Sequence, residues 1–156
     1  MKIHTSTKCA LIALISICFI GAVHAGPEHS HAALEEIASP NGGRVVTVVE
    51  PHFEFWLRSD RVAQITFIDD TGKAIPVGAQ QISLVGGSRS DPVSFNFVQK
   101  SGVLVSEGPL PEIKNMPIVL QIKAAPDSKK VREKFYLNLS KCGSCSYQEY
   151  ACICGH

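Results

Sequence analysis

Short runs of β-branched and aromatic residues alternate with turn residues along most of this chain. The clearest run, Phe53 to Leu57, is apolar at positions 53, 55 and 57 and carries Glu54 and Trp56 between them. A period of two is that of a strand with one buried face. By the same reasoning, strands are expected at Val45–Val49, Phe53–Leu57, Val62–Ile68, Ala74–Val77, Gln81–Val85, Val93–Val98, Val103–Ser106, Ile118–Ala124 and Val131–Leu139.

Turn-forming segments separate these runs at regular intervals. Examples are Asp69–Lys73, which is rich in residues that tolerate positive φ, and Gly108–Pro111. No helical pattern follows Ala38. The spacing predicts an all-β protein, an immunoglobulin-like antiparallel β-sandwich over residues 44–140, with a closed barrel as the main alternative.

The first residues have the pattern of a secretory signal peptide. Lys2 and Lys8 precede an uncharged apolar run, Ala10–Val23, and small residues lead up to Ala25. The run is shorter than the roughly 20 residues that a helix needs to span a bilayer, and no later segment comes closer. We expect cleavage of residues 1–25 near Ala25, a periplasmic or secreted protein, and no membrane span.

Residues 26–43 are expected to form an N-terminal segment with a short helix. Ser30 is a suitable cap for the run Ala32–Ala38, and the turn residues Pro40–Gly43 would end it.

The charge balance of the chain does not point to a strongly charged partner. The chain has a formal net charge of +1, and removal of Lys2 and Lys8 with the signal peptide would leave it nearly neutral. Such a balance does not favour nucleic acid or an anionic membrane surface. The mature chain would run from Gly26 to His156, 131 residues (156 minus 25), which is long enough for an ordinary core without covalent cross-links.

The residues best suited to bind a metal are concentrated in a tail, residues 141–156. Of the 6 cysteines, Cys9 and Cys18 lie in the signal peptide, and the predicted sandwich contains none. A C-x2-C turn directs two sulfurs inward, and alternate residues of an extended segment share a face. Five donors could therefore converge on a transition metal, with zinc or copper(I) the natural occupant. They are Cys142, Cys145, Cys152, Cys154 and His156.

Disulfides are the main alternative for this tail, because export exposes thiols to oxidation. A bond between Cys152 and Cys154 would close a strained loop. The remaining pairings are Cys142 with Cys154 and Cys145 with Cys152, or the crossed arrangement. A third interpretation, a thiol oxidoreductase motif at Cys142–Cys145, lacks the βαβ setting that such motifs have.

Two weaker metal candidates lie elsewhere. One joins His29 and His31, with help from Glu28 and the amine of Gly26. The other pairs His52 with Glu54, which would share the exposed face of a regular strand. No set of nucleophile, base and orienting residue is recognisable, so we do not expect an enzyme.

Two stretches also carry a resemblance. Ser39–Arg44 followed by Val49–Phe55, together with the Cys-rich ending, resembles small periplasmic proteins encoded beside bacterial heavy-metal efflux systems. The Pro-Asn-Gly-Gly-Arg phrase also resembles one in the periplasmic adaptor subunits of such pumps. The resemblance implies a periplasmic accessory that binds copper, zinc or a related cation near an efflux-pump component.

The sequence thus supports two hypotheses. The first is a periplasmic metal-binding accessory of heavy-metal homeostasis or efflux. The second is a non-catalytic β-sandwich interaction protein of the cell envelope with a disulfide-stapled tail. In both, the hydrophobic core is expected to lie upstream of residue 140, so that the tail is an appendix to a fold that does not need it.

Overall fold

The computed structural model describes residue 37 and residues 39–154. The chain divides into two units, Met1–Ser30 and His31–His156, and every described residue belongs to the second. The predicted signal peptide, the short helix after Ser30, and the candidate donors Gly26, Glu28, His29, His31 and His156 lie outside the described residues.

The described chain is all β, as predicted, apart from a 3-10 turn near its end. Every strand pairing is antiparallel. The expected strand at Ala74–Val77 is reduced to an isolated bridge between Ile68 and Ala74. The elements are β1 (Arg44–Val46), β2 (His52–Leu57), β3 (Val62–Ile68), β4 (Gln81–Gly87), β5 (Pro92–Lys100), β6 (Val103–Pro109), β7 (Met116–Lys123), β8 (Val131–Leu137) and the 3-10 turn η2 (Glu149–Ala151).

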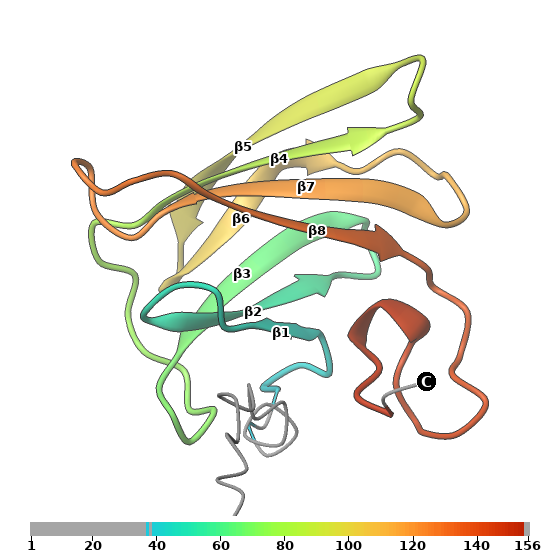
Figure 1. Cartoon of the computed structure of the whole chain (residues 1–156), viewed down its shortest axis with the longest axis horizontal. Coiled ribbons are helices and arrows are strands. Elements are labelled where there is room, and N and C mark those ends of the chain that lie inside the picture. Colours follow the sequence, from blue (N-terminus) through green and yellow to red (C-terminus); the bar gives the residue numbers. More distant parts are fainter. Residues whose placement is uncertain (1–36, 38, 155–156) are drawn as a thin grey trace, which may run out of the picture. The chain divides into compact units, whose positions relative to one another are not determined.

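All the strands belong to one continuous 8-stranded sheet, in the order β1-β2-β3-β6-β5-β4-β7-β8. The finer expectation of an immunoglobulin-like sandwich of two sheets is therefore not confirmed, and the curled sheet is closer to the barrel alternative (Figure 1). The strands β4, β5 and β6 form a meander, and β7 returns to lie beside β4. This is a Greek-key arrangement.

The sheet bends at β5, because the two halves of this strand have different partners. Residues 92–96 pair with β4, whereas residues 97–100 pair with β6. A strand that changes partner in this way forms a corner. The strands β1, β2, β3 and β6 consequently face β4, β7 and β8 across a common interior (Figure 1).

Apolar side chains fill that interior, and they come from the inward faces of strands in which apolar and polar residues alternate. The predicted inward face of β2, residues 53, 55 and 57, is buried, and Phe53 packs edge-on against Phe67 of β3 at 5.9 Å between ring centroids. Phe55 packs against Phe135 of β8 at 5.2 Å. Contact between β2 and β8 brings the two ends of the strand order together.

The other face of β2 carries Glu54, which is fully buried rather than exposed. Its carboxylate accepts hydrogen bonds from the Ser39 hydroxyl, from the backbone N–H groups of Asn41 (2.8 Å) and Gly43 (2.8 Å), and from the Asn41 side-chain amide (2.7 Å). A Cβ at Gly43 would collide with the carbonyl oxygen of Phe55, so only glycine permits this approach. The Pro-Asn-Gly-Gly phrase is thus held against β2 by a buried carboxylate.

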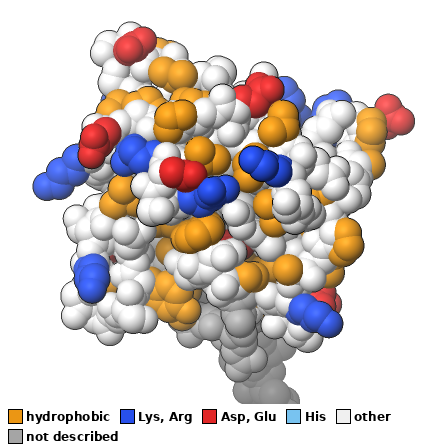
Figure 2. Space-filling model, turned by 180° about the vertical axis from the view of Figure 1, so that it is seen from behind, with side chains coloured by type: hydrophobic (Ala, Val, Ile, Leu, Met, Phe, Trp, Pro, Cys, Tyr) orange, Lys and Arg blue, Asp and Glu red, His pale blue; other side chains and the backbone are white. Residues whose placement is uncertain are grey.

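The outer surface of the described barrel has no obvious preference for one sign of charge on the face shown in Figure 2. Basic and acidic side chains are interspersed there. Among the described residues, no helix is long and apolar enough to cross a membrane.

We predict that Glu54→Gln destabilises the fold by about 1–3 kcal/mol, because an amide NH2 would replace one acceptor oxygen and leave buried N–H donors without a partner. Urea denaturation measures the loss. The matched control is Glu107→Gln, since Glu107 is exposed on β6. Equal stability of the two variants would contradict the role assigned to Glu54.

Candidate metal centre

The tail after β8 turns back on itself before it reaches η2. Lys141 forms an isolated antiparallel bridge with Gln148, and the N–H of Cys142 donates to the carbonyl oxygen of Tyr147 at 2.9 Å. The N–H of Glu149 donates to Ser140 at 2.9 Å. These bonds close a tight loop that carries Cys142 and Cys145, and η2 follows directly.

The turn η2 belongs to the hydrophobic core, and the expectation that the core ends before residue 140 is wrong. Tyr150 and Ala151 are each 3% exposed and belong to the core cluster. The Tyr150 ring packs edge-on against Phe55, and its hydroxyl oxygen accepts the N–H of Leu57 at 3.3 Å. Burial, together with the nearby charge of Glu54, raises the pKa of Tyr150, so this phenol is neutral at physiological pH.

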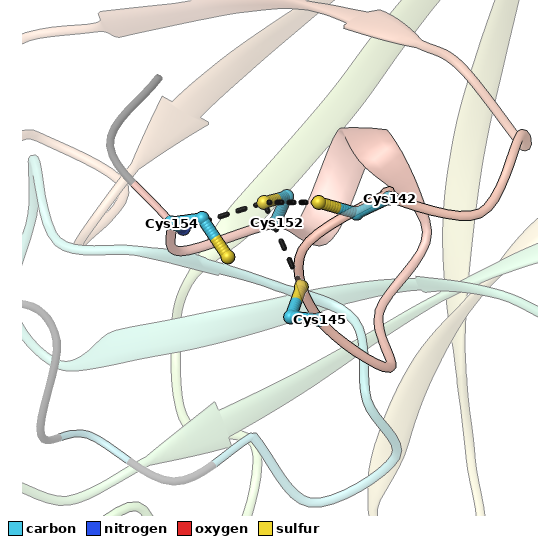
Figure 3. Close-up of side chains that lie close together, drawn as sticks. All are labelled: Cys142, Cys145, Cys152 and Cys154. Carbon is cyan, nitrogen blue, oxygen red and sulfur yellow. Dashed lines mark hydrogen bonds between the residues drawn. The ribbon is translucent and has the colours of Figure 1, made fainter.

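Beyond η2 the chain is extended, and its cysteines meet those of the loop. The sulfur of Cys152 lies 3.3 Å from that of Cys142 and 3.7 Å from that of Cys145. The sulfurs of Cys142, Cys145, Cys152 and Cys154 all lie within 4.8 Å of one another. Figure 3 shows these side chains converging from the loop on one side and from the terminal segment on the other. All four are free thiols.

This spacing matches a four-thiolate metal site. With a zinc–sulfur bond of about 2.3 Å, the edge of a tetrahedron of sulfurs is about 3.8 Å. Two separate disulfides would instead sort the sulfurs into two bonded pairs. Here one sulfur, that of Cys152, lies close to two others, as it does around a common centre. The cluster of four cysteines could hold a metal ion.

Backbone N–H groups around the cluster are directed at sulfur. The N–H of Ser144 donates to the sulfur of Cys142 at 3.4 Å, and the N–H of Cys154 donates to that of Cys152 at 3.3 Å. Each donor lies two residues after its acceptor, so the local turn supplies the bond. Such donors stabilise a thiolate, which is the form that binds metal.

The thiols of Cys142, Cys152 and Cys154 differ in acidity. The Ser144 N–H, followed by the hydrogen bond with Cys152, lowers the pKa of Cys142 to about 7. The hydrogen bonds with Cys145 and Cys152 raise the pKa of Cys154 to about 12. At Cys152 the N–H of Cys154 lowers the pKa, but burial and the contact with Cys142 outweigh it, and the net direction is upward. One thiolate therefore forms first, and its negative charge opposes the others.

Burial also separates the four positions. Cys142 is buried at 6% exposure, Cys145 and Cys152 are half-buried, and Cys154 is exposed. An ion in this cluster would lie against the barrel on the Cys142 side and face solvent on the Cys154 side. The fifth predicted donor, His156, lies outside the described residues.

The two donors of the second weaker candidate, His52 and Glu54, do not come together in the structure. Glu54 has its oxygens engaged by the loop at residues 39–43 and does not join His52, so its prediction as a surface donor is wrong. His52 instead lies with Glu50 and Asp70, all within 4.8 Å. Its Nδ1 is 3.0 Å from the carbonyl oxygen of Val49 and 3.3 Å from Glu50.

Two residues, Asp70 and Tyr150, were not predicted from the sequence. Pairing of His52 with Ile68 brings the turn after β3 to the start of β2, and only this register places Asp70 beside His52. The signal for Tyr150 was its apolar setting, Tyr150-Ala151, in a tail otherwise rich in polar residues and cysteine. A buried turn this short does not produce a recognisable hydrophobic period in the sequence.

Comparison of this chain with family models, with curated proteins and with solved structures finds no match.

We predict that the first proton leaves the reduced, metal-free cluster at a pH of about 7, because the Ser144 N–H lowers the pKa of Cys142 to that value. Ultraviolet absorbance of thiolate, followed against pH, measures this step. Cys142→Ser should move the first step to higher pH, whereas the control Cys154→Ser should leave it in place. An unchanged first step in Cys142→Ser would contradict the assignment.

Proposed function

We propose that this protein is a transition-metal-binding accessory of heavy-metal homeostasis or efflux in the bacterial periplasm, and that it holds one ion in the four-cysteine cluster. The single observation that carries the metal part is the sharing of the Cys152 sulfur between those of Cys142 and Cys145, at 3.3 and 3.7 Å.

Thiolate chemistry restricts the ion to a borderline or soft metal. Four sulfurs at tetrahedral spacing suit zinc, whereas a subset of the same thiolates suits copper(I). The N–H groups of Ser144 and Cys154 would remain directed at the ligand sulfurs and spread their negative charge. An ion in this position binds as cargo or as a signal, and no catalytic group is assigned to it.

The cellular part of the proposal rests on the sequence. The pattern of residues 1–25 supports export, and the resemblance of Ser39–Arg44, Val49–Phe55 and the Cys-rich ending supports work beside a metal efflux system. The partner would be an efflux-pump component. Recovery of periplasmic protein beginning at Gly26, measured by intact mass, tests this part independently of the metal.

We predict that reduced protein binds one zinc or copper(I) ion per chain and that Cys142→Ser abolishes binding, since it removes the most buried ligand. Cys154→Ser should weaken binding less, because this sulfur is exposed and solvent or a neighbouring donor can take its place. Native mass spectrometry and competition with a chromophoric chelator measure both effects. Ser140→Ala, an exposed change directly before the tail, is the matched control.

Mass spectrometry of protein taken directly from the periplasm separates the proposal from its rival. Bound metal with free thiols supports the metal-binding function. A mass lower by four hydrogens and no metal supports an interaction protein with a disulfide-stapled tail. The Cys142–Cys152 contact, at 3.3 Å between sulfurs, is the observation that favours this rival. Failure to bind either ion after reduction would overturn the proposal.

A further inference from the structure

The curled sheet stops short of closing between its first and last strands. The strands β1 and β8 are the two ends of the strand order, and the pairings of the described residues join each of them only to its inner neighbour. Edge strands carry backbone groups that no strand satisfies. We call the gap between β1 and β8 the seam.

Side chains cross the seam where the backbone does not. Arg44 of β1 forms an ion pair with Glu133 of β8 at 3.2 Å, and its guanidinium lies over the Phe135 ring, 5.1 Å from the centroid. The ion pair is partly exposed, with side-chain exposures of 34% and 19%, so by itself it contributes at most about 1 kcal/mol. A second element is needed to hold the seam.

That element is η2, which contacts both β1 and β8. The carbonyl oxygen of Tyr150 accepts a hydrogen bond from Arg44 at 3.5 Å, and the N–H of Tyr150 donates to Asn138, just after β8, at 3.1 Å. Its ring and hydroxyl reach Phe55 and Leu57 of β2. One residue therefore touches both sides of the seam and the core beneath it.

The cysteine cluster brackets η2 in the sequence. Cys142 and Cys145 precede the turn, and Cys152 and Cys154 follow it. An ion shared by these thiolates ties the two flanks together and removes the conformations in which η2 has left the core. Without the ion, the segment is held by the Tyr150 contacts and a few hydrogen bonds of the loop.

We infer that the ion-loaded tail is a latch, which holds η2 in the seam and so makes the closure of the barrel depend on metal occupancy. This inference rests on the proposed metal binding and adds that binding is transmitted to β1 and β8. By thermodynamic linkage, contacts across the seam must in turn strengthen metal binding by the same factor.

Hydrogen exchange of the full reduced protein, with and without zinc, tests the latch. At zinc concentrations about 100 times the dissociation constant, amides that open only after ion loss gain about a hundredfold protection. We expect a substantial part of this gain at β1 and β8 and little at the hairpin of β4 and β5, which lies away from η2 (Figure 1). Protection confined to residues 141–154 would overturn the latch and leave metal binding intact.

The reciprocal test changes the seam and measures the metal. Arg44→Met removes the ion pair and the bond to Tyr150, and Glu133→Gln removes only the charge of the pair. We expect zinc affinity to fall about fivefold or more in Arg44→Met and by less in Glu133→Gln. Arg132→Met, an exposed change on β8, is the control. Wild-type affinity in a folded Arg44→Met would overturn the latch, whereas absence of zinc binding in the wild type would overturn the proposed function instead.

Discussion

Tyr150 docks between two strands that do not pair, and the arrangement of the whole described chain depends on that contact. A curled antiparallel sheet that does not close has two edge strands, and proteins protect such edges by covering them, by keeping them short or by placing charges on them. Here the edges β1 and β8 are covered by a turn whose tyrosine is 3% exposed. The ring fills the end of the core, the hydroxyl accepts a β2 amide, and the backbone reaches Arg44 and Asn138.

Because of this contact, the cysteine tail is not an appendix to the fold. An appendix could gain or lose an ion without consequence for the barrel, but the segment between Cys145 and Cys152 contains part of the core. A metal ion or disulfides would link the two flanks of that segment. This link would lie beside the seam, where β1 and β8 do not pair. The tail is therefore part of the fold, and its chemistry and the stability of the seam belong together.

A second buried polar contact lies near the same end of β1 and β2. Glu54 binds the loop at residues 39–43 and so fixes the approach to β1. That loop also reaches the tail, because a Cβ at Gly42 would stand 3.9 Å from the Tyr147 ring. The Pro-Asn-Gly-Gly-Arg stretch thus has a structural explanation in this chain: a carboxylate on β2 and a glycine that lets the loop approach it.

The sequence alone located the eight strands of the described chain and the four cysteine donors, but it missed η2 and predicted a strand at Ala74–Val77 that is only a bridge. Alternation of apolar residues located the strands to within a few positions, because burial of one face of a strand imposes a period of two. The spacing of Cys142, Cys145, Cys152 and Cys154 predicted their convergence, because turn and extended geometry are local. Tertiary structure decided everything that depends on which segments meet. It determined the single sheet with its corner at β5 and the burial of Glu54. It also determined which residues lie beside His52 and where Tyr150 packs in the seam. Periodicity reports how much of a segment is buried but not against what, and a polar residue beneath a loop has the same pattern as one facing solvent.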